Sequence, residues 1–305
     1  VFWCFYALLA VSSLAMLVSM VRASRLAVQA QRDAIEIKRL GQYTLEEKLG
    51  EGGMGVVYRA KHAMLSRPTA VKFLDSSKAN EKSIARFERE VQLTSQLNHP
   101  NTIAIYDYGR TPEGVFYYAM EYLDGLDLQT LVGRHGPQPE GRVIHILKQV
   151  CGSLAEAHSI GLIHRDVKPA NILLNARGGM FDVVKLLDFG LVKLIDHSQE
   201  AQVTKAGGAV GTPMYMSPEA YQSSETVDGR TDLYAVGAVG YFLLTGDPPF
   251  IGETMLDVIK QQIQTIPEAP SQRLGQPISP ELENLLLRCL AKSPTERPAT
   301  ANEII

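Results

Sequence analysis

The stretch LIHRDVKPANILL, residues 162–174, decides the fold of this chain. An acid, two cations and an amide follow one another closely in it, between two apolar segments that we expect to be strands: Arg165, Asp166, Lys168 and Asn171. Buried polar groups need hydrogen-bond partners, so an ordinary loop rarely holds so many of them. A further acid, Asp188, follows the apolar residues 186–187, which we expect to end a strand.

These side chains differ in the chemistry that they offer. Asn171 and Asp188 provide hard oxygen ligands, of the kind that Mg²⁺ takes together with phosphate oxygens. Asp166 is a carboxylate that can accept a proton from an incoming hydroxyl. The sequence therefore predicts a site that combines metal ligands with a proton acceptor.

A glycine-rich loop, GEGGMG over residues 50–55, lies earlier in the chain. Glycines at positions 50, 52 and 55 let the backbone turn sharply and bring its N–H groups against an anion. The strand-like residues 56–60 follow directly, whereas a dinucleotide-binding fingerprint requires a helix there. We therefore expect a hairpin that lies over phosphates; a plain glycine hairpin is the alternative when the motif is taken alone.

A lysine interrupts the next apolar strand, residues 69–74. Alternation along this strand places Ala70, Lys72 and Leu74 on one face and Val71 and Phe73 on the other. An ammonium group among apolar side chains is costly unless it meets an anion. A solvated lysine on an edge strand is the alternative, but Ala70 leaves room for a flat ligand and the glycine loop lies one strand upstream. The helix expected over 83–97 places Glu90 where it can pair with Lys72.

Two further segments complete the pattern of elements. Residues 115–121 form an expected strand that ends in a turn at 124–125. Residues 142–159 form an expected long helix, whose apolar stripe we interpret as plain core.

The motifs together resemble the eukaryotic-like (Hanks-type) protein kinases, over about residues 43–302. They occur in the order and spacing of that family: Gly50–Val57, Lys72, Glu90, His164–Asn171, Asp188–Gly190 and Ser217–Glu219. The resemblance implies an α+β, two-lobed fold, with a β-rich small lobe over about 41–123 and a mainly helical large lobe over about 124–305. It also implies ATP and Mg²⁺ as cofactors, with Mn²⁺ as a substitute.

The resemblance implies a role for each site residue. Lys72, paired with Glu90, would hold the α- and β-phosphates, and Lys168 would steady the γ-phosphate. Asp166 would take the proton of the substrate hydroxyl, while Asn171 and Asp188 would bind Mg²⁺. The ATP site would comprise the glycine loop, the adenine pocket and the hinge: Leu49, Gly50, Glu51, Gly52, Gly53, Met54, Gly55, Val56, Val57, Ala70, Lys72, Glu90, Glu121, Leu123 and Leu173. Met120 would be the gatekeeper, with backbone groups of Glu121 and Leu123 facing adenine.

Three other parts of the large lobe match the family. Asp232 and Gly237 correspond to its central buried helix, and Glu219 would pair with Arg297. Ser217 stands where the family often has Ala, another small residue. Lys168 and the segment 211–215 resemble the serine/threonine-specific members, and the sequence of residues 51–55 resembles that of bacterial members.

The activation segment, residues 188–219, carries three hydroxyl side chains of interest: Ser198, Thr204 and Thr212. We expect autophosphorylation near Thr204 to switch the enzyme on, with Arg165 clamping the phosphate. Thr212 is expected to pack against Lys168 instead. A pseudokinase scaffold that binds nucleotide or partners without transfer is an alternative, as is a small-molecule phosphotransferase of related fold. The presence of the residues needed for transfer disfavours the pseudokinase. The Ser-Pro-Glu segment with its long activation loop disfavours the small-molecule phosphotransferase.

The first 21 residues contain no charged side chain. A helix of that length spans about 30 Å, the thickness of a bilayer core. Trp3 and Tyr6 would suit an interfacial belt. A cleaved signal peptide is the alternative, but it needs a shorter apolar run and a basic leader. The chain begins at Val1 rather than Met, so we expect it to be a fragment.

Basic residues exceed acidic ones just after this run: Arg22, Arg25, Arg32, Lys38 and Arg39 against Asp33 and Glu36. Such an excess marks the cytoplasmic side of a membrane. We therefore expect a single-pass protein of the cell membrane, with a short juxtamembrane helix over 22–40 and a cytoplasmic catalytic unit over 41–305. A homodimer would allow autophosphorylation in trans.

The overall composition excludes several other classes. Among 305 residues, 30 are Lys or Arg and 33 are Asp or Glu, giving a net charge of −3, which disfavours a nucleic-acid partner. Three widely separated cysteines disfavour a disulfide scaffold or a thiolate zinc site. We expect protein substrates that carry Ser or Thr.

Overall fold

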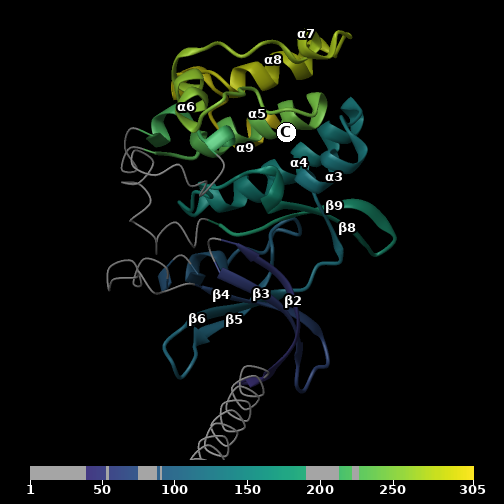
Figure 1. Ribbon diagram of the computed structural model, residues 1–305, viewed down its shortest axis with the longest axis vertical. Helices are drawn as coiled ribbons and strands as arrows, with labels where there is room; N and C mark the ends of the chain where they lie inside the picture. Colours follow the sequence, from purple (N-terminus) through teal and green to yellow (C-terminus); the bar gives the residue numbers. More distant parts are fainter. Residues whose placement is uncertain (1–38, 53–54, 75–87, 90, 190–212, 222–226) are drawn as a thin grey trace, which may run out of the picture.

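The computed structural model describes residues 39–52, 55–74, 88–89, 91–189, 213–221 and 227–305 (Figure 1). Several predictions concern residues outside these ranges: the membrane helix 1–21, the segment 22–38, Gly53, Met54, Glu90, Ser198, Thr204 and Thr212. Within the described ranges, no helix combines the length and the apolar character that crossing a bilayer requires.

The small lobe is built on one antiparallel sheet with the strand order β1-β2-β3-β4-β6-β5. Its strands are β1 (Arg39–Leu40), β2 (Tyr43–Gly52), β3 (Gly55–His62), β4 (Pro68–Leu74), β5 (Ile105–Arg110) and β6 (Phe116–Glu121). Residues 88–89 and 91–94 are helical, so the helix expected over 83–97 ends earlier than predicted. The three strands expected in this lobe, 56–60, 69–74 and 115–121, are confirmed as β3, β4 and β6, with bounds that differ by at most two residues.

The predicted boundary between the juxtamembrane segment and the small lobe was wrong. Arg39 and Leu40, assigned from the sequence to a juxtamembrane helix, form strand β1 and pair with Thr44 and Tyr43. Gly41 makes the tight turn between the two strands with a φ of +54°. Leu40 and Tyr43 are both buried, so burial of these two side chains favours a strand over a solvated helix at this point.

The two faces of β4 separate as alternation predicts. Ala70 and Leu74 join a buried cluster that faces the large lobe and includes Ile103 and Met120. Val71 belongs to a second cluster on the opposite face, against which Phe73 packs. Lys72, which is itself buried, therefore lies on the same face as Ala70.

The large lobe surrounds one buried helix. Its helices are α3 (Leu128–His135), α4 (Glu140–Ser159), α5 (Arg230–Thr245), α6 (Met255–Gln264), α7 (Pro270–Leu274), α8 (Pro280–Cys289) and α9 (Ala301–Ile304). Every residue of α5 from Thr231 to Thr245 is buried. A side chain at Gly237 would meet the Cβ of Cys289 at 2.5 Å, so α5 and α8 approach closely only because this residue is glycine. The predicted central buried helix is thus confirmed.

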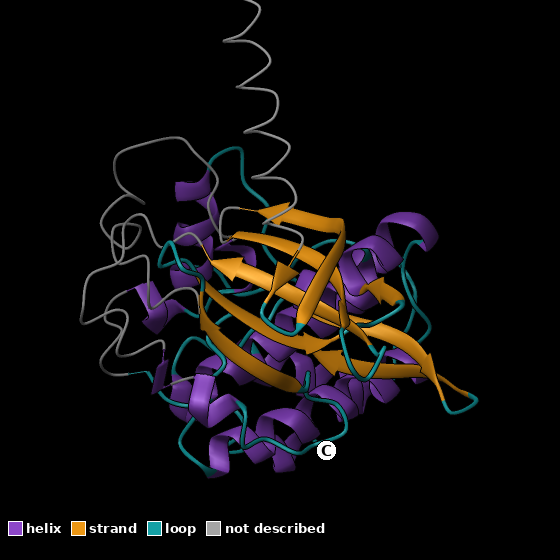
Figure 2. Ribbon diagram, turned by 90° about the horizontal axis from the view of Figure 1, so that it is seen from below, coloured by secondary structure: helices purple, strands orange, loops and turns teal. Residues whose placement is uncertain are grey.

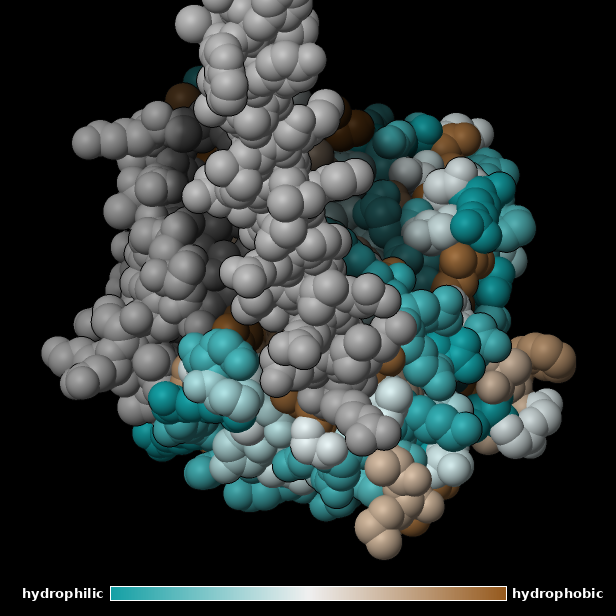
Figure 3. Space-filling view, turned by 60° about the horizontal axis from the view of Figure 1, so that its bottom comes forward, coloured by the Kyte–Doolittle hydropathy of each residue, from teal (hydrophilic) through white to brown (hydrophobic). Residues whose placement is uncertain are grey.

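A small second sheet lines the large lobe where it meets the small one (Figure 1). It consists of β7 (Gly125–Asp127), β8 (Ile172–Arg177) and β9 (Met180–Leu186), in the order β7-β8-β9. Figure 2 shows the strands in front of the large-lobe helices. The face seen in Figure 3 is largely hydrophilic where it is coloured, with apolar side chains standing out in only a few places.

The expected strand at Leu162–Ile163 was wrong. Residues 162–168 form an irregular loop, followed by the 3₁₀ turn η1 (Pro169–Asn171). The backbone N–H groups of His164 and Arg165 donate to the carboxylate of Asp232 instead of to a neighbouring strand. A side chain from α5 thus replaces the ladder partner that a strand would need.

Candidate active site

The two polar motifs meet at the junction of the lobes. The backbone N–H of Leu187 donates to the carbonyl of Asn171 at 2.9 Å. The Nε2 of His164 donates to the carbonyl of Leu187 at 2.8 Å, while its Nδ1 accepts from the N–H of Asp166 at 3.2 Å. Burial lowers the pKa of His164, so the neutral ring can make both contacts. The loop that carries Asp166 is thereby joined to the segment that carries Asp188.

Asp166 is the centre of a compact polar cluster. Lys168 Nζ lies 2.7 Å from its Oδ2. The amide nitrogen of Asn171 donates to both the backbone carbonyl and Oδ2 of Asp166, each at 2.8 Å. These contacts fix the orientation of the Asp166 carboxylate, so the structure brings together three of the predicted site residues.

Asp232 supports this cluster from beneath. Its Oδ1 accepts from the N–H of Arg165 at 2.8 Å, and its Oδ2 accepts from the N–H of His164 at 2.8 Å. The Nε2 of His158 also lies 2.8 Å from Oδ2. Arg165 has a φ of +61°, an unfavourable value for a residue with a side chain. The Asp232 carboxylate compensates for this strain and so holds the catalytic loop in shape.

Asp188 has two donors in this structure. Lys72 Nζ contacts its Oδ2, and the hydroxyl of Tyr118 donates to its Oδ1 at 2.5 Å. Burial alone would raise the pKa of Asp188, but the charge of Lys72 and the two hydrogen bonds hold that pKa below its usual value. Asp188 is therefore an ionised carboxylate. Sequence reasoning missed the Tyr118 contact.

The predicted partner of Lys72 was Glu90, which lies outside the described residues, so that pairing stays a prediction. What the structure does place beside Lys72 is Asp188, a predicted metal ligand. Both side chains belong to the site, as expected. The buried lysine thus has the anion that its apolar surroundings require.

The donor set fits Mg²⁺. The hydrogen bonds of Asn171 described above use its amide nitrogen, which leaves its amide oxygen for a cation. Within the described ranges, His, Cys, Asp and Glu side chains form no group of three that could hold a metal on their own. Mg²⁺ is commonly bound by one or two carboxylates together with substrate phosphates, so a sparse oxygen set suits it.

The glycine loop forms the predicted hairpin between β2 and β3, with Gly52 paired to Gly55. Gly55 has a φ of +129°, and a Cβ there would lie 1.9 Å from the carbonyl oxygen of Phe73. Glycine is therefore obligatory at this position for packing against β4, a reason that the sequence did not reveal. Glu51 contacts Lys48 at the surface. Leu49 and Val56 flank the turn, one exposed and one half-buried.

The expected adenine pocket is largely assembled. Val57 and Leu123 pack against the cluster that contains Ala70 and Met120. Leu173, the remaining predicted member, lies half-buried on β8 and belongs to neither this cluster nor the core of the large lobe. The roles expected for the backbone groups of Glu121 and Leu123 toward adenine stay predictions. The backbone N–H of Glu121 is taken by the carbonyl of Ala104 at 3.0 Å, so it does not face a nucleotide.

A second buried lysine was missed. Lys185 on β9 donates to Glu121 Oε1 at 2.6 Å, and both side chains are 5% exposed. Arg177 reaches the other oxygen of Glu121 at 2.8 Å, and the N–H of Ala104 donates to Oε1 at 2.9 Å. Lys185 stands in an apolar strand just as Lys72 does, so the same sequence signal would have found it.

A small pocket lies beside the loop that carries Asp166 and Lys168. It is lined by Arg165, Asp166, Val167, Lys168, Tyr215, Met216, Ser217, Thr231, Asp232 and Ala235. Asp166 and Lys168 therefore border an opening that the segment around Tyr215 also borders. A side chain entering here would approach the Asp166 carboxylate.

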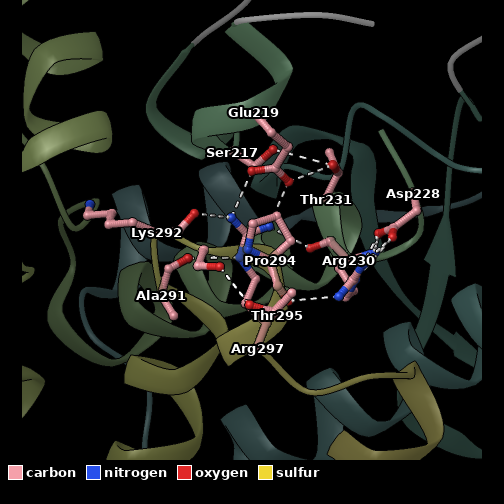
Figure 4. A network of polar contacts seen from close by, with 11 residues as sticks. Ser217, Glu219, Asp228, Arg230, Thr231, Ala291, Lys292, Pro294, Thr295 and Arg297 are labelled. Carbon is pink, nitrogen blue, oxygen red and sulfur yellow. Dashed lines mark hydrogen bonds and ion pairs between the residues drawn. The ribbon is translucent and has the colours of Figure 1, made fainter. Parts of the chain in front are cut away.

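The predicted Glu219–Arg297 pair is confirmed (Figure 4). The guanidinium makes two parallel hydrogen bonds to the carboxylate, and Thr231 donates to the same carboxylate at 2.8 Å. Glu219 lies in η3 (Pro218–Tyr221) and Arg297 follows η4 (Pro294–Glu296). The pair therefore fixes the end of the activation segment to the base of the large lobe.

Known proteins resemble this chain in sequence. The chain is 42% identical over 263 residues to the serine/threonine-protein kinase pkn3 of Myxococcus xanthus, covering 85% of this chain and 48% of pkn3. It is 41% identical over 267 residues to the serine/threonine-protein kinase PknB of Mycolicibacterium smegmatis, covering 86% of this chain and 42% of PknB. The chain thus spans less than half the length of these relatives.

Solved structures agree with the sequence relatives. The kinase domain of Mycobacterium tuberculosis PknI matches with a TM-score of 0.66 and 28% identity, covering 87% of this chain and 94% of that domain. The family model described as protein kinase domain matches residues 43–305. The two-lobed fold and the motif resemblance are thereby confirmed, and the chain belongs to the protein kinase family.

Proposed function

We propose that this chain is a serine/threonine protein kinase that transfers the γ-phosphoryl group of ATP to hydroxyl side chains of proteins. The observation that carries the proposal is the fixed Asp166 carboxylate, held by Lys168 and Asn171, next to the Lys72–Asp188 pair. The names of the relatives at 41–42% identity support the same activity.

Asp166 is placed to accept the proton of an acceptor hydroxyl that enters the pocket bordered by Tyr215 and Met216. Lys168, 2.7 Å from this carboxylate, brings a positive charge to the place where the transferred phosphoryl group would lie. Lys72 is positioned to turn from Asp188 to the phosphates of a nucleotide under the glycine hairpin.

Asn171 and Asp188 would hold Mg²⁺, which when bound neutralises charge on the nucleotide phosphates. The protein's own part is to hold these two oxygen ligands close together. The bond from the N–H of Leu187 to the carbonyl of Asn171 does this through the backbone. The adenine ring would lie between Val57 and Ala70 above and Leu173 below.

Specificity for Ser and Thr is supported by Lys168, two residues after Asp166, and by the relatives' printed names. We further propose that the kinase phosphorylates itself on the activation segment near Thr204, with Arg165 binding the phosphate. Mass spectrometry of the active enzyme should find phosphate on this segment. An active enzyme without phosphate there would reject the switch but leave the kinase activity standing.

We also propose that residues 1–21 anchor the chain in the cell membrane, with the kinase domain on the cytoplasmic side. The uncharged run and the basic residues after it support this. Fractionation of cells that express the chain, compared with a chain beginning at residue 39, tests the anchor. Equal distribution of both chains to the soluble fraction would exclude it. A homodimer that phosphorylates in trans is testable by mixing active chain with an Asp166→Asn chain.

The central experiment incubates the chain with ATP, Mg²⁺ and a generic protein substrate, beside the Asp166→Asn variant. Loss of the proton acceptor should lower kcat by about 10²- to 10⁴-fold. Nucleotide affinity should stay within about threefold, because Asp166 is not expected to hold ATP. If wild type and variant transfer equally little while both bind nucleotide, the pseudokinase alternative replaces this proposal. Phosphorylation of small molecules but not of protein would favour the other alternative, a small-molecule phosphotransferase of related fold.

A further inference from the structure

Tyr118 reaches the proposed metal ligand from a position that would normally hold an apolar side chain. It lies in the middle of β6 and belongs to the buried cluster of Ala70, Leu74, Ile103 and Met120. Its side chain is 1% exposed, so its ring fills core space. Its hydroxyl nevertheless donates to Asp188 Oδ1 at 2.5 Å.

The sheet register explains why the hydroxyl arrives there. Tyr118 is paired directly opposite Lys72 across β4 and β6, so the two side chains lie on the same face. Lys72 Nζ is 6.0 Å from the centre of the Tyr118 ring. Both side chains therefore point toward Asp188 and take one carboxylate oxygen each.

These two donors occupy the oxygens that a cation would use. Mg²⁺ binds carboxylate oxygens at about 2.0–2.1 Å and in nearly ideal octahedral geometry. Lys72 can leave Asp188 for a nucleotide phosphate, since its side chain is long and flexible. Tyr118 has no such alternative, because its ring is held by the surrounding apolar side chains.

We propose that Tyr118 is a positioning residue that holds Asp188 in the metal-free enzyme, and that the Asp188 carboxylate leaves the phenol when magnesium nucleotide binds. This role of Tyr118 rests on the proposed function: the phenol lowers the affinity of the site for Mg²⁺. Without the phenol, Asp188 Oδ1 would be available to the cation at once. The enzyme would then bind magnesium nucleotide at lower metal concentration.

The test uses Tyr118→Phe, which keeps the ring and removes only the hydroxyl. The matched control is Tyr117→Phe, since Tyr117 is next along β6 and its ring packs against Phe73 on the opposite face. The first measurement is the Mg²⁺ concentration for half-maximal binding of a non-hydrolysable ATP analogue. The second is the melting temperature with and without Mg²⁺ and the analogue. Tyr118→Met, a second apolar replacement, is measured in the same way if the Phe variant does not fold.

We expect Tyr118→Phe to lower the half-saturating Mg²⁺ concentration by about tenfold, because a hydrogen bond to a charged group is lost only from the metal-free state. Its metal-free melting temperature should fall, and the rise produced by Mg²⁺ and analogue should grow. Tyr117→Phe should leave the half-saturating concentration unchanged.

An unchanged or higher Mg²⁺ requirement in Tyr118→Phe overturns the inference, as does an equal loss of melting temperature in both states. Either result would mean that the phenol stays on Asp188 when the metal is bound, or that it has only a structural role. If wild type binds no magnesium nucleotide at all, the proposed function fails instead. The two failures are therefore distinguishable.

Discussion

Arg297 binds Glu219 through two parallel hydrogen bonds, of 2.7 Å from Nη1 to Oε1 and 2.8 Å from Nη2 to Oε2. The arginine side chain is 0% exposed and the glutamate side chain 16%. The remaining guanidinium hydrogens reach the backbone carbonyls of Ala291, Arg230 and Lys292 (Figure 4). The charge of Arg297 is therefore fully enclosed, and Glu219 is the side chain that neutralises it.

Replacement of Glu219 by Gln should destabilise the protein strongly, because it leaves a buried arginine without its counter-charge. Removing one partner of a buried pair costs about 3–5 kcal/mol. Urea denaturation followed by circular dichroism measures the loss. The matched control is Arg288→Gln, which breaks a pair with Glu303 that is 52% and 41% exposed. That change should cost less than about 1 kcal/mol. Similar losses in the two variants would contradict the argument.

The same pair predicts a dependence on pH. Burial alone would raise the pKa of Glu219, but the hydrogen bonds and charge of Arg297 bring it below the usual 4.5. A carboxyl group whose pKa is lowered by folding binds more protons in the unfolded chain. Its contribution to the free energy of unfolding is complete above about pH 4.5 and is lost as the pH falls through the lower, folded value. The stability difference between wild type and Glu219→Gln should therefore shrink below that pH. A difference that stays constant from pH 7 to pH 3 would refute this.

The glycine hairpin offers a test with two of its glycines, Gly55 and Gly50. Gly55→Ala places a Cβ 1.9 Å from the Phe73 carbonyl oxygen at a φ of +129°. We expect a loss of at least about 2 kcal/mol in the free energy of unfolding, from backbone strain and displacement of β4. Gly50→Ala is the control, since a Cβ there meets nothing within 4 Å. It should change stability by less than about 1 kcal/mol. Equal effects of the two substitutions would show that the contact with Phe73 is unimportant.

The sequence predicted the parts of this site that depend on local pattern. Alternation placed Lys72 on the same face as Ala70, and the residues after the glycine loop identified a hairpin. Pairing of Glu219 with Arg297 came from the family resemblance and is confirmed. The first two features could be predicted because period and turn chemistry are local properties, whereas the pair joins distant segments and was accessible only through the resemblance.

Contacts between distant segments were not predictable in this way. In the sequence pattern, Tyr118 is an ordinary strand residue. Only the register of β6 against β4 shows that its hydroxyl reaches Asp188. Leu162–Ile163 has the composition of a strand, yet Asp232 on a distant helix takes the backbone donors that follow it. Long-range side-chain contacts can replace a strand ladder, and single-sequence patterns contain no trace of them.

Asp232→Asn should lower the rate of transfer far more than the affinity for nucleotide. The side chain of Asn has one accepting oxygen where Asp has two, so one of the two hydrogen bonds from the N–H groups of His164 and Arg165 is lost and an NH2 group faces that N–H instead. The loop that carries Asp166 would then shift, and a displacement of about 1 Å can reduce the rate about 10²-fold. Steady-state kinetics and nucleotide binding, measured on the same samples, separate the two effects. A fall in nucleotide affinity that matches the fall in kcat would indicate general unfolding instead.

Lys185 and Glu121 provide the last test, because they form an ion pair that is nearly inaccessible to water. Lys185→Met leaves a buried carboxylate and Glu121→Gln leaves a buried ammonium group, so each should cost about 3–5 kcal/mol. The double variant removes both charges and should lose less than the sum of the single losses, by about 0.5–3 kcal/mol. Arg177→Met is the control, since Arg177 also contacts Glu121 but is 56% exposed, and it should cost less than about 1 kcal/mol. Denaturant unfolding of the four variants measures these energies. Strict additivity would mean that the two charges do not stabilise each other.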